Sequence, residues 1–364
     1  MKILQATTAR GWSGGTEQCL LLAKYMNKLG YETHILTFKN CELDKRAENL
    51  GIKRVHFPNT KKFSLKEARK LSQIIQNYDI VNTHISKAHW FIWLASLFTR
   101  KRPKLIYTRR VFFDISMISA ITKYNINVDA IIGISHEIYE KLRNYPLIKK
   151  KIHYIPSGIE LDRFNPYIKT KISIKEDLNI PSNAIVITHI ANFSEVKGQH
   201  ILLKAFQKFT TMHPDRNLVL LLAGRDTQSE KAYQLIKKLN LTKKVIPLGF
   251  RRDVPQILKD TDIFVFPSLS EGLGSSLLQA MAMKKIVVAS YVGGIKTYLK
   301  HMENGIAVEP GSIESLYKGL LTAIENINNE KLKENARKTA LDFDIEKVVD
   351  RTLKVYREVL NGVS

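Results

Sequence analysis

The stretch from Pro267 to Ala282 combines the residue types that bind sugars and phosphates. It follows a short apolar run and leads into a predicted helix, and ligands of doubly wound α/β folds bind where a strand passes into a helix. Gly272 and Gly274 have no side chain, so their backbone N–H groups can approach a ligand closely. The serines after them are expected to cap a helix whose first amides attract a phosphate. Glu271 can accept hydrogen bonds from sugar hydroxyls, and Gln279 can reach a second polar group from within the helix. The candidate ligand-binding residues here are Glu271, Gly272, Leu273, Gly274, Ser275 and Gln279.

Two other points of the chain could hold an anion. Gly14 and Gly15 follow the first apolar run, and Thr16 is expected to cap the helix that begins there. A nucleotide-binding P-loop is excluded because no Gly-Lys-Ser/Thr follows. Lys197 follows a predicted strand in the second half, where it could supply the point charge that a departing diphosphate needs. A lone lysine is more often a solvated side chain.

His84 ends the predicted strand 79–84, and an imidazole at the carboxyl end of a parallel strand can bond to a sugar hydroxyl. An isolated histidine is more often structural. Asp260 and Asp262 superficially match the D-x-D metal motif of some metal-dependent enzymes, but they precede a strand, so we interpret them as a helix end and a strand start. The His and Cys spacings match no zinc site, and no metal is predicted.

The elements that position these residues alternate between short apolar strands and amphipathic helices. Continuous Ile/Val/Leu runs indicate strands that are buried on both faces, which is typical of parallel sheets, and two sets of such units predict two doubly wound domains. The expected strands are 2–7, 33–38, 53–57, 79–84, 104–108 and 130–135, then 184–190, 218–224, 245–249, 263–267, 286–290 and 305–309; the expected helices include 16–29, 198–213, 229–240, 253–260, 275–283, 312–326 and 331–341.

A change in composition divides the chain. We expect an N-terminal Rossmann-like domain over 1–165, a polar linker around 165–181, and a C-terminal Rossmann-like domain over 166–343. The amphipathic segment 344–364 is expected to form a helix that must pack on a domain, with the N-terminal domain as a candidate.

The chain is strongly basic, with 57 Lys and Arg against 34 Asp and Glu among 364 residues, a net charge of +23. Residues 1–165 carry +15 and residues 166–364 carry +8. Such an excess favours anionic partners, namely nucleic acid, anionic lipid or a phosphorylated substrate, although a lysine-rich proteome also produces basic proteins. We expect a cytoplasmic protein for three reasons: the chain has only two cysteines, it has no apolar run long enough to span a membrane, and it has no signal-peptide pattern.

Seven motifs follow one another along the chain: GGTE from Gly14, VNTH ending at His84, IPSGIELDRF, Lys197–Gly198, EGLGSSLLQAMA from Glu271, VGGIKTYL and NGIAVEP. In this order they resemble the retaining nucleotide-sugar glycosyltransferases of family 4, which have the GT-B fold. The resemblance implies an α/β protein of two doubly wound Rossmann-like domains that face an interdomain crevice, with the acceptor in the first domain and the donor in the second. It also implies metal-independent transfer of a hexose, UDP-hexose being the expected donor, without a cofactor.

The resemblance assigns roles and shows two departures. The family's Glu-x7-Glu pattern maps onto Glu271 and Gln279, so an amide replaces the carboxylate that bonds the ribose. Asn192 stands where the family has an arginine, which leaves Lys197, backbone amides, Arg252 or Arg225 to neutralise the diphosphate. The matching histidine, His84, faces the donor sugar in the family. The implied catalytic residues are Glu271, His84 and Lys197; the implied donor-binding residues are Gly14, Gly15, Asn192, Lys197, Arg252, Gly272, Leu273, Gly274, Ser275 and Gln279.

Two other classes of function share some of these features. A nucleotide-sugar epimerase or hydrolase of the same fold would need an acid/base carboxylate pair, and only Glu271 is evident. A nucleic-acid-binding protein is disfavoured because the basic residues are scattered and no recognition motif is present.

The segment 89–104 predicts an acceptor at a membrane, either lipopolysaccharide core or another lipid-linked glycan. It combines aromatic and basic residues, which suits a peripheral anchor on the inner face of the cell membrane. The alternative is a core helix with a basic exit. The sequence leaves the oligomeric state open. The candidate anchor residues are Trp90, Trp93, Phe98, Arg100, Lys101, Arg102 and Lys104.

Overall fold

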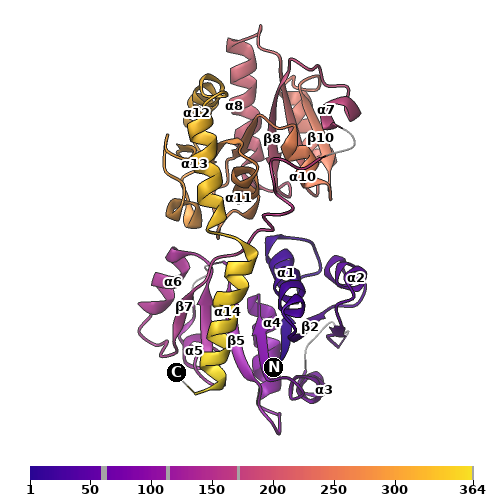
Figure 1. Ribbon diagram of the computed structural model, residues 1–364, viewed down its shortest axis with the longest axis vertical. Coiled ribbons are helices and arrows are strands. Elements are labelled where there is room, and N and C mark those ends of the chain that lie inside the picture. Colours follow the sequence, from indigo (N-terminus) through magenta and orange to yellow (C-terminus); the bar gives the residue numbers. More distant parts are fainter. Residues whose placement is uncertain (59–63, 112–114, 170–172, 363–364) are drawn as a thin grey trace. The chain divides into compact units, whose positions relative to one another are not determined.

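The structure is a computed structural model that describes residues 1–58, 64–111, 115–169 and 173–362. The chain forms two compact units (Figure 1). Unit 1 comprises Met1–Gly158 and Ile345–Ser364, and unit 2 comprises Ile159–Asp344. The division therefore falls at Gly158, ahead of the polar segment 165–181 in which we expected the linker.

Unit 1 is built on a seven-stranded parallel sheet of order β3-β2-β1-β4-β5-β6-β7. The strand order reverses between β1 and β4, and Ala6 at the end of β1 pairs with Thr83 at the end of β4. Residues that follow these two strands are therefore neighbours at one edge of the sheet. The strands are β1 Lys2–Ala6, β2 Glu32–Thr37, β3 Arg54–His56, β4 Ile80–Thr83, β5 Lys104–Arg109, β6 Ala130–Gly133 and β7 Ile152–Tyr154; the helices are α1 Gly14–Lys28, α2 Glu42–Asn49, α3 Leu65–Ile75, α4 Ser86–Ser96, α5 Met117–Ile121, α6 His136–Arg143 and α14 Ile345–Leu360.

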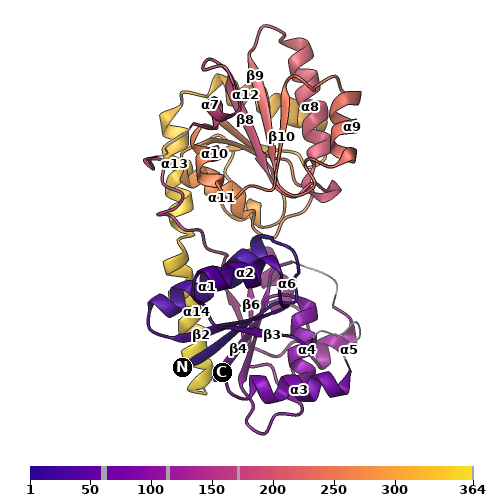
Figure 2. The same ribbon diagram turned by 90° about the vertical axis from the view of Figure 1, so that its right-hand side faces the viewer.

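Unit 2 has a six-stranded parallel sheet of order β10-β9-β8-β11-β12-β13, which reverses between β8 and β11. In Figure 2, α8 and α9 lie on one face of this sheet and α10 and α11 on the other. The strands are β8 Ile185–Ile190, β9 Leu218–Ala223, β10 Val245–Gly249, β11 Ile263–Phe266, β12 Ile286–Ser290 and β13 Ile306–Val308; the helical elements are α7 Ile174–Asp177, η1 Glu195–Lys197, α8 Gln199–Met212, α9 Glu230–Lys238, α10 Val254–Lys259, α11 Ser275–Ala282, η2 Gly293–Thr297, α12 Ile313–Glu325 and α13 Glu330–Leu341.

Both sheets are parallel because their strands are apolar on both faces. The strand LVLLLA, β9, is buried at every residue, and so is IFVF, β11. The predicted fold class, two Rossmann-like parallel-sheet domains, is confirmed. Within the described residues unit 1 has one more strand than expected: β7, with the sequence IHY, is short and half-buried, so its pattern lacks the apolar run that marked the others.

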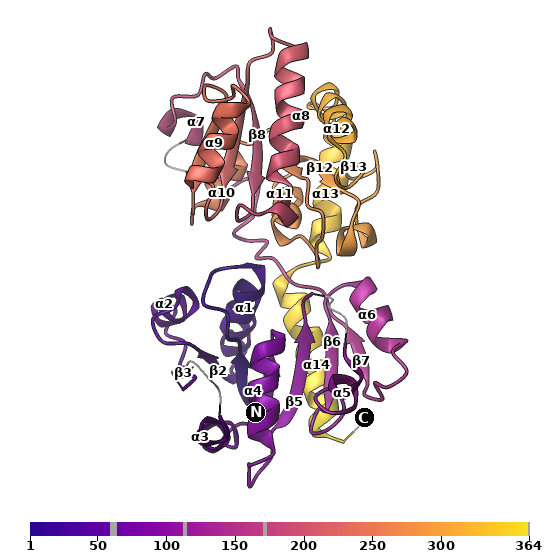
Figure 3. The ribbon, with the colours of Figure 1, turned by 180° about the vertical axis from the view of Figure 1, so that it is seen from behind.

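The C-terminal helix α14 belongs to unit 1. Its apolar face joins β1 and α1 in one core cluster, and Tyr356 is fully buried there. Gly158 allows the close approach, because a Cβ at this position would lie 2.7 Å from Cα of Ile345. Figure 1 shows α14 over one face of the unit 1 sheet, and Figure 3, seen from behind, shows α4 over the other face.

Candidate active site

The reversal point of unit 2 brings two predicted residues together. Lys197 follows β8 and Glu271 follows β11, the neighbouring strand. Nζ of Lys197 forms an ion pair and hydrogen bond with Oε1 of Glu271, and Oγ of Ser268 donates to the same oxygen over 3.0 Å. The Glu271 side chain is only 9% exposed. Two residues for which separate roles were predicted are therefore one coupled pair.

Two glycines fix the loops that carry this pair. Gly198 has φ 71°, and a Cβ there would lie 2.0 Å from the carbonyl oxygen of Pro267. Gly293 has φ 53°, and a Cβ there would lie 2.0 Å from the carbonyl oxygen of Glu271. Both positions combine a left-handed backbone with backbone-to-backbone contact, which only glycine permits. The lysine and glutamate loops are held in place by this packing.

Helix α11 begins at Ser275, where the expected helix 275–283 begins, but a different residue caps it. Its N-cap is Gly274, with φ 80°, so the prediction that Ser275 and Ser276 are the capping residues was wrong. Both serines lie in the first turn, and Oγ of Ser276 donates to the carbonyl oxygen of Ile190 over 3.0 Å, which ties the helix start to the end of β8. The first amides of the helix still carry the positive end of its dipole. Gly272 has no positive φ, and Leu273 is buried in the core.

Gln279 lies in α11 with only 7% of its surface exposed. Within the described part of the chain, its side-chain amide makes no hydrogen bond. Neither atom of this amide is among the fully buried polar atoms that lack a partner, so the amide is accessible from outside the helix.

Asn192 is tied to the loop that follows β9. Its Oδ1 accepts a hydrogen bond from the backbone N–H of Arg225 over 3.2 Å. The guanidinium of Arg225 lies 5.6 Å from the ring centroid of Phe250. Arg252 follows β10, which is two strands away from β8 in the sheet, and its side chain is exposed. Of the two arginines considered as substitutes, Arg225 is the one whose loop contacts Asn192.

In unit 1, His84 follows β4 as expected, but its ring is fully buried. Nε2 lies 2.7 Å from Oε1 of Gln5, and Nδ1 lies 2.8 Å from Nη2 of Arg110. Arginine can only donate, so Nδ1 accepts and the proton resides on Nε2. Burial, and then the charge of Arg110, lower the pKa of His84 well below its usual range, so the ring is neutral. Direct contact with a sugar, as predicted, would require the ring to release one of these partners.

The start of α1 also differs from expectation. The helix begins at Gly14 with Ser13 as N-cap, so the prediction that Thr16 caps it was wrong. Thr16 lies in the first turn, where its Oγ1 accepts a hydrogen bond from the backbone N–H of Ser13 over 2.8 Å. A Cβ on Gly15 would lie 3.2 Å from Cδ of Arg110, so this glycine makes room for an arginine. Sequence reasoning missed Arg110, although a pair of arginines directly after the predicted strand 104–108 was a usable signal.

The described residues contain no group of three or more His, Cys, Asp or Glu side chains that could hold a metal ion. Oδ2 of Asp260 accepts a hydrogen bond from the backbone N–H of Ile174 over 2.6 Å, and Oδ2 of Asp262 accepts one from Val186 over 2.8 Å. Both carboxylates anchor backbone, in agreement with our interpretation of this motif. None of the described helices is both long enough and apolar enough to cross a membrane.

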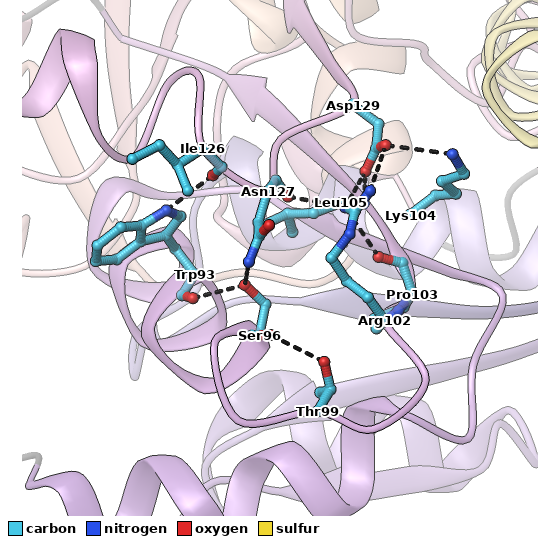
Figure 4. A network of polar contacts seen from close by, with 10 residues as sticks. All are labelled: Trp93, Ser96, Thr99, Arg102, Pro103, Lys104, Leu105, Ile126, Asn127 and Asp129. Atoms are coloured by element: carbon cyan, nitrogen blue, oxygen red, sulfur yellow. Dashed lines mark hydrogen bonds and ion pairs between the residues drawn. The ribbon is translucent and has the colours of Figure 1, made fainter. Parts of the chain in front are cut away.

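Part of the segment 89–104 makes contacts within unit 1 (Figure 4). Trp93 is buried, and its Nε1 donates to the carbonyl oxygen of Ile126 over 2.9 Å. Arg102 pairs with Asp129 over 2.6 Å, and Nζ of Lys104 lies 3.4 Å from the same carboxylate. Trp93 is therefore a core residue, whereas Arg102 and Lys104 are partly exposed and pair with Asp129. Other members of the segment face solvent, namely Trp90, at 41% exposure, Arg100 and Lys101.

Comparison with known proteins agrees with this geometry. Residues 12–163 match the model of Glycosyltransferase Family 4, and residues 170–339 match that of Glycosyl transferases group 1. The chain is 26% identical to UDP-Gal:alpha-D-GlcNAc-diphosphoundecaprenol alpha-1,3-galactosyltransferase of Escherichia coli, over 78% of this chain and 76% of that protein. It is also 26% identical to N-acetyl-alpha-D-glucosaminyl L-malate synthase of Bacillus anthracis, over 96% and 94%. The crystal structure of Anabaena HepE in complex with UDP and glucose superposes with a TM-score of 0.85 at 22% identity, covering 98% of this chain and 100% of that one.

Proposed function

Because the chain belongs to the family 4 glycosyltransferases and has the GT-B fold, we propose that it moves a hexose from a nucleotide diphosphate sugar to a hydroxyl group with retention at the anomeric carbon. The observation that carries this proposal is the Lys197–Glu271 pair beside the N-terminus of α11. It places a cation, a carboxylate and free helix amides at the reversal point of the sheet, where ligands of such folds bind.

Each group matches one requirement of the reaction. A departing diphosphate develops negative charge, which Lys197 and the first amides of α11 would stabilise. Glu271 would accept hydrogen bonds from donor hydroxyls, and Gln279 would bond the ribose. No metal or cofactor is required in this proposal. UDP is the proposed nucleotide, in line with the UDP-sugar in the name of the Escherichia coli relative and the UDP bound to HepE.

Retention is proposed to proceed without a covalent intermediate. Oε1 of Glu271 already accepts hydrogen bonds from Lys197 and Ser268, and these bonds reduce its nucleophilicity. The leaving phosphate oxygen would instead take the proton of the acceptor hydroxyl, and the acceptor would attack the face from which the phosphate departs. Water must be kept out during this step, since it would hydrolyse the donor.

We propose a lipid-linked glycan or lipopolysaccharide core as the acceptor, at the inner face of the cell membrane. The Escherichia coli relative is named for a substrate linked to diphosphoundecaprenol, which supports this class. The exposed residues of unit 1 also support a peripheral membrane contact. Ile118 on α5 is 74% exposed, and Trp90 on α4 and the basic residues Arg100 and Lys101 are exposed as well.

The test is transfer of radiolabel from UDP-glucose, UDP-galactose and UDP-N-acetylglucosamine, with and without a bacterial lipid extract. We expect label in the lipid fraction only when protein and extract are both present, and an α-linked product by NMR from an α-linked donor. A β-linked product would overturn retention. Free labelled sugar without transfer would favour a hydrolase, and conversion of one UDP-sugar into another would favour an epimerase.

A further inference from the structure

The segment that carries the motif VGGIKTYL lies against the loop that joins β11 to α11 in unit 2. It forms η2, and Tyr298 is the C-cap residue of this short helix. The backbone N–H of Gly294 donates to the carbonyl oxygen of Glu271 over 3.2 Å. The hydroxyl of Tyr298 donates to the carbonyl oxygen of Leu273 over 2.7 Å. Two carbonyl groups of the loop are therefore turned toward the same segment.

The direction of these two carbonyl groups sets the direction of two amides. In a planar trans peptide the N–H points away from the C=O of the same plane. The N–H of Gly272 shares its peptide plane with the carbonyl of Glu271, and the N–H of Gly274 shares its plane with the carbonyl of Leu273. Both N–H groups therefore point away from η2, on the opposite side of the loop.

Neither of these amides is used by the part of the chain that the structure describes. The N–H groups of Gly272 and Gly274 donate to no described residue. Gly274 is the N-cap of α11, so its N–H lies just ahead of the first turn of that helix. Backbone N–H groups of native proteins are bonded to protein, to water or to a ligand, so these two can donate to a bound anion.

Tyr298 is itself fixed by its surroundings. Its side chain is buried, and its ring packs edge-on against Phe343 with the ring centroids 5.3 Å apart. Nδ2 of Asn304 donates to the backbone carbonyl of Tyr298 over 2.7 Å. A Cβ on Gly274 would lie 3.2 Å from the Tyr298 hydroxyl and 3.4 Å from Cγ1 of Ile295, so the loop rests closely on this segment. The loop therefore has a firm support behind its two amides.

We propose that Tyr298 and η2 are positioning residues of the donor site. They hold the N–H groups of Gly272 and Gly274 in the direction in which both donate to the diphosphate of the nucleotide sugar. This role rests on the proposed function and concerns a motif, VGGIKTYL, for which the sequence indicated no task. Amides that are fixed before the reaction need no reorientation when negative charge develops on the leaving phosphate.

The experiment compares UDP with uridine, which lacks the diphosphate, on the full chain. UDP is titrated by isothermal titration calorimetry, and uridine by ligand-observed NMR. Tyr298→Phe removes only the hydroxyl, and we expect its UDP affinity to fall about fivefold or more while its uridine affinity changes less than about twofold. Tyr317→Phe is the matched control, because the Tyr317 hydroxyl lies 3.2 Å from Nε2 of His213 elsewhere in unit 2. Its loss should leave both affinities unchanged.

A purely structural role for Tyr298 predicts a different result. Equal UDP affinity of Tyr298→Phe and the wild type would overturn the proposal, and so would equal losses for UDP and uridine. If Tyr298→Phe does not fold, as judged by circular dichroism, Phe343→Leu replaces it. That variant removes the ring that packs on Tyr298, and it should weaken UDP about twofold or more with uridine unchanged.

The same titrations separate this role from the proposed function. UDP binding by the wild type without any sugar transfer would contradict the proposed function and leave the positioning role of Tyr298 intact. Sugar transfer by the wild type, together with an unchanged UDP affinity in Tyr298→Phe, would support the proposed function and overturn the positioning role. No UDP binding by the wild type would contradict both.

Discussion

Arg110 donates a hydrogen bond to Nδ1 of His84 over 2.8 Å, and this contact leaves one of two neighbouring basic side chains charged and the other neutral. A protonated imidazole would have no lone pair for the guanidinium and would add a second positive charge beside it. The histidine is therefore held neutral and the arginine charged. His84, which the motif suggested as the group that touches the sugar, acts in this structure as the support of another residue.

Lys197→Ala and Glu271→Ala should each reduce kcat/KM about a hundredfold or more. Loss of one pre-organised charge contact raises the activation barrier of transfer by on the order of 3 kcal/mol. Because the two side chains form an ion pair, the double variant should lose much less than the product of the two single effects. Steady-state kinetics of all four proteins measures this coupling. Fully multiplicative losses, or wild-type turnover in either single variant, would contradict the paired role.

Gln279 replaces the family's glutamate and Asn192 replaces its arginine, so the pocket lacks one anion and one cation. We expect these two losses to compensate for each other. Gln279→Glu alone should not improve donor affinity, because it adds negative charge near a diphosphate. Gln279→Glu with Asn192→Arg should at least match the wild type, although Asn192→Arg also removes the bond from Asn192 Oδ1 to the Arg225 amide. UDP-sugar titration of the four proteins forms a double-mutant cycle. Strict additivity would show that the two positions are independent.

Gly198→Ala should destabilise unit 2 and displace the lysine loop, because its new Cβ would meet the carbonyl oxygen of Pro267 at 2.0 Å. Gly311→Ala is the matched control: Gly311 also has positive φ, at 81°, but its nearest contact would be an ordinary 3.7 Å. We expect a loss of about 1 kcal/mol for the control and of at least about 3 kcal/mol for Gly198→Ala. Denaturant unfolding measures both. Equal losses would mean that the backbone angle alone, and not the contact, requires glycine.

Membrane association should depend on exposed residues of the segment 89–104 and not on its buried ones. Trp90→Ala combined with Arg100→Ala should reduce co-sedimentation with phosphatidylglycerol vesicles, and added salt should weaken the binding of the wild type. Trp93→Ala should instead cost about 3–5 kcal/mol of stability, because this side chain is buried and bonded. No vesicle binding by the wild type at low salt would contradict the membrane proposal.

Acid should destabilise unit 1 through its buried histidines. Burial lowers the pKa of His89 to about 4, so the folded chain binds a proton more weakly than the unfolded chain, whose histidine has a pKa near 6.5. This contribution is complete above pH 6.5 and is lost as the pH falls toward 4, with about 2 kcal/mol lost between pH 7 and pH 5. Thermal unfolding of the wild type and of His89→Gln should show a smaller acid loss in the variant. His136→Gln, at an exposed site, should match the wild type.

The sequence alone was sufficient to predict the two parallel-sheet domains and the strand ends that carry Lys197 and Glu271. Runs such as LVLLLA indicate strands buried on both faces, which requires parallel sheets covered by helices. The motifs around Lys197 and Glu271 follow strands that are neighbours at a reversal of strand order, so their proximity follows from topology. Such properties are encoded within short stretches, where residue period and glycine positions are visible.

Only the tertiary structure decided which polar groups are partners and which are left without one. Gln5 and Tyr356 are 351 residues apart, and no local pattern links them or relates Gly15 to Arg110. The sequence also could not decide the environment of Trp93, because an aromatic side chain suits both a membrane surface and a core. Its hydrogen bond to the carbonyl oxygen of Ile126 places it in the core. The physical reason is that burial and hydrogen bonding between distant segments depend on how complete elements pack, whereas residue period reports only the local conformation of each element.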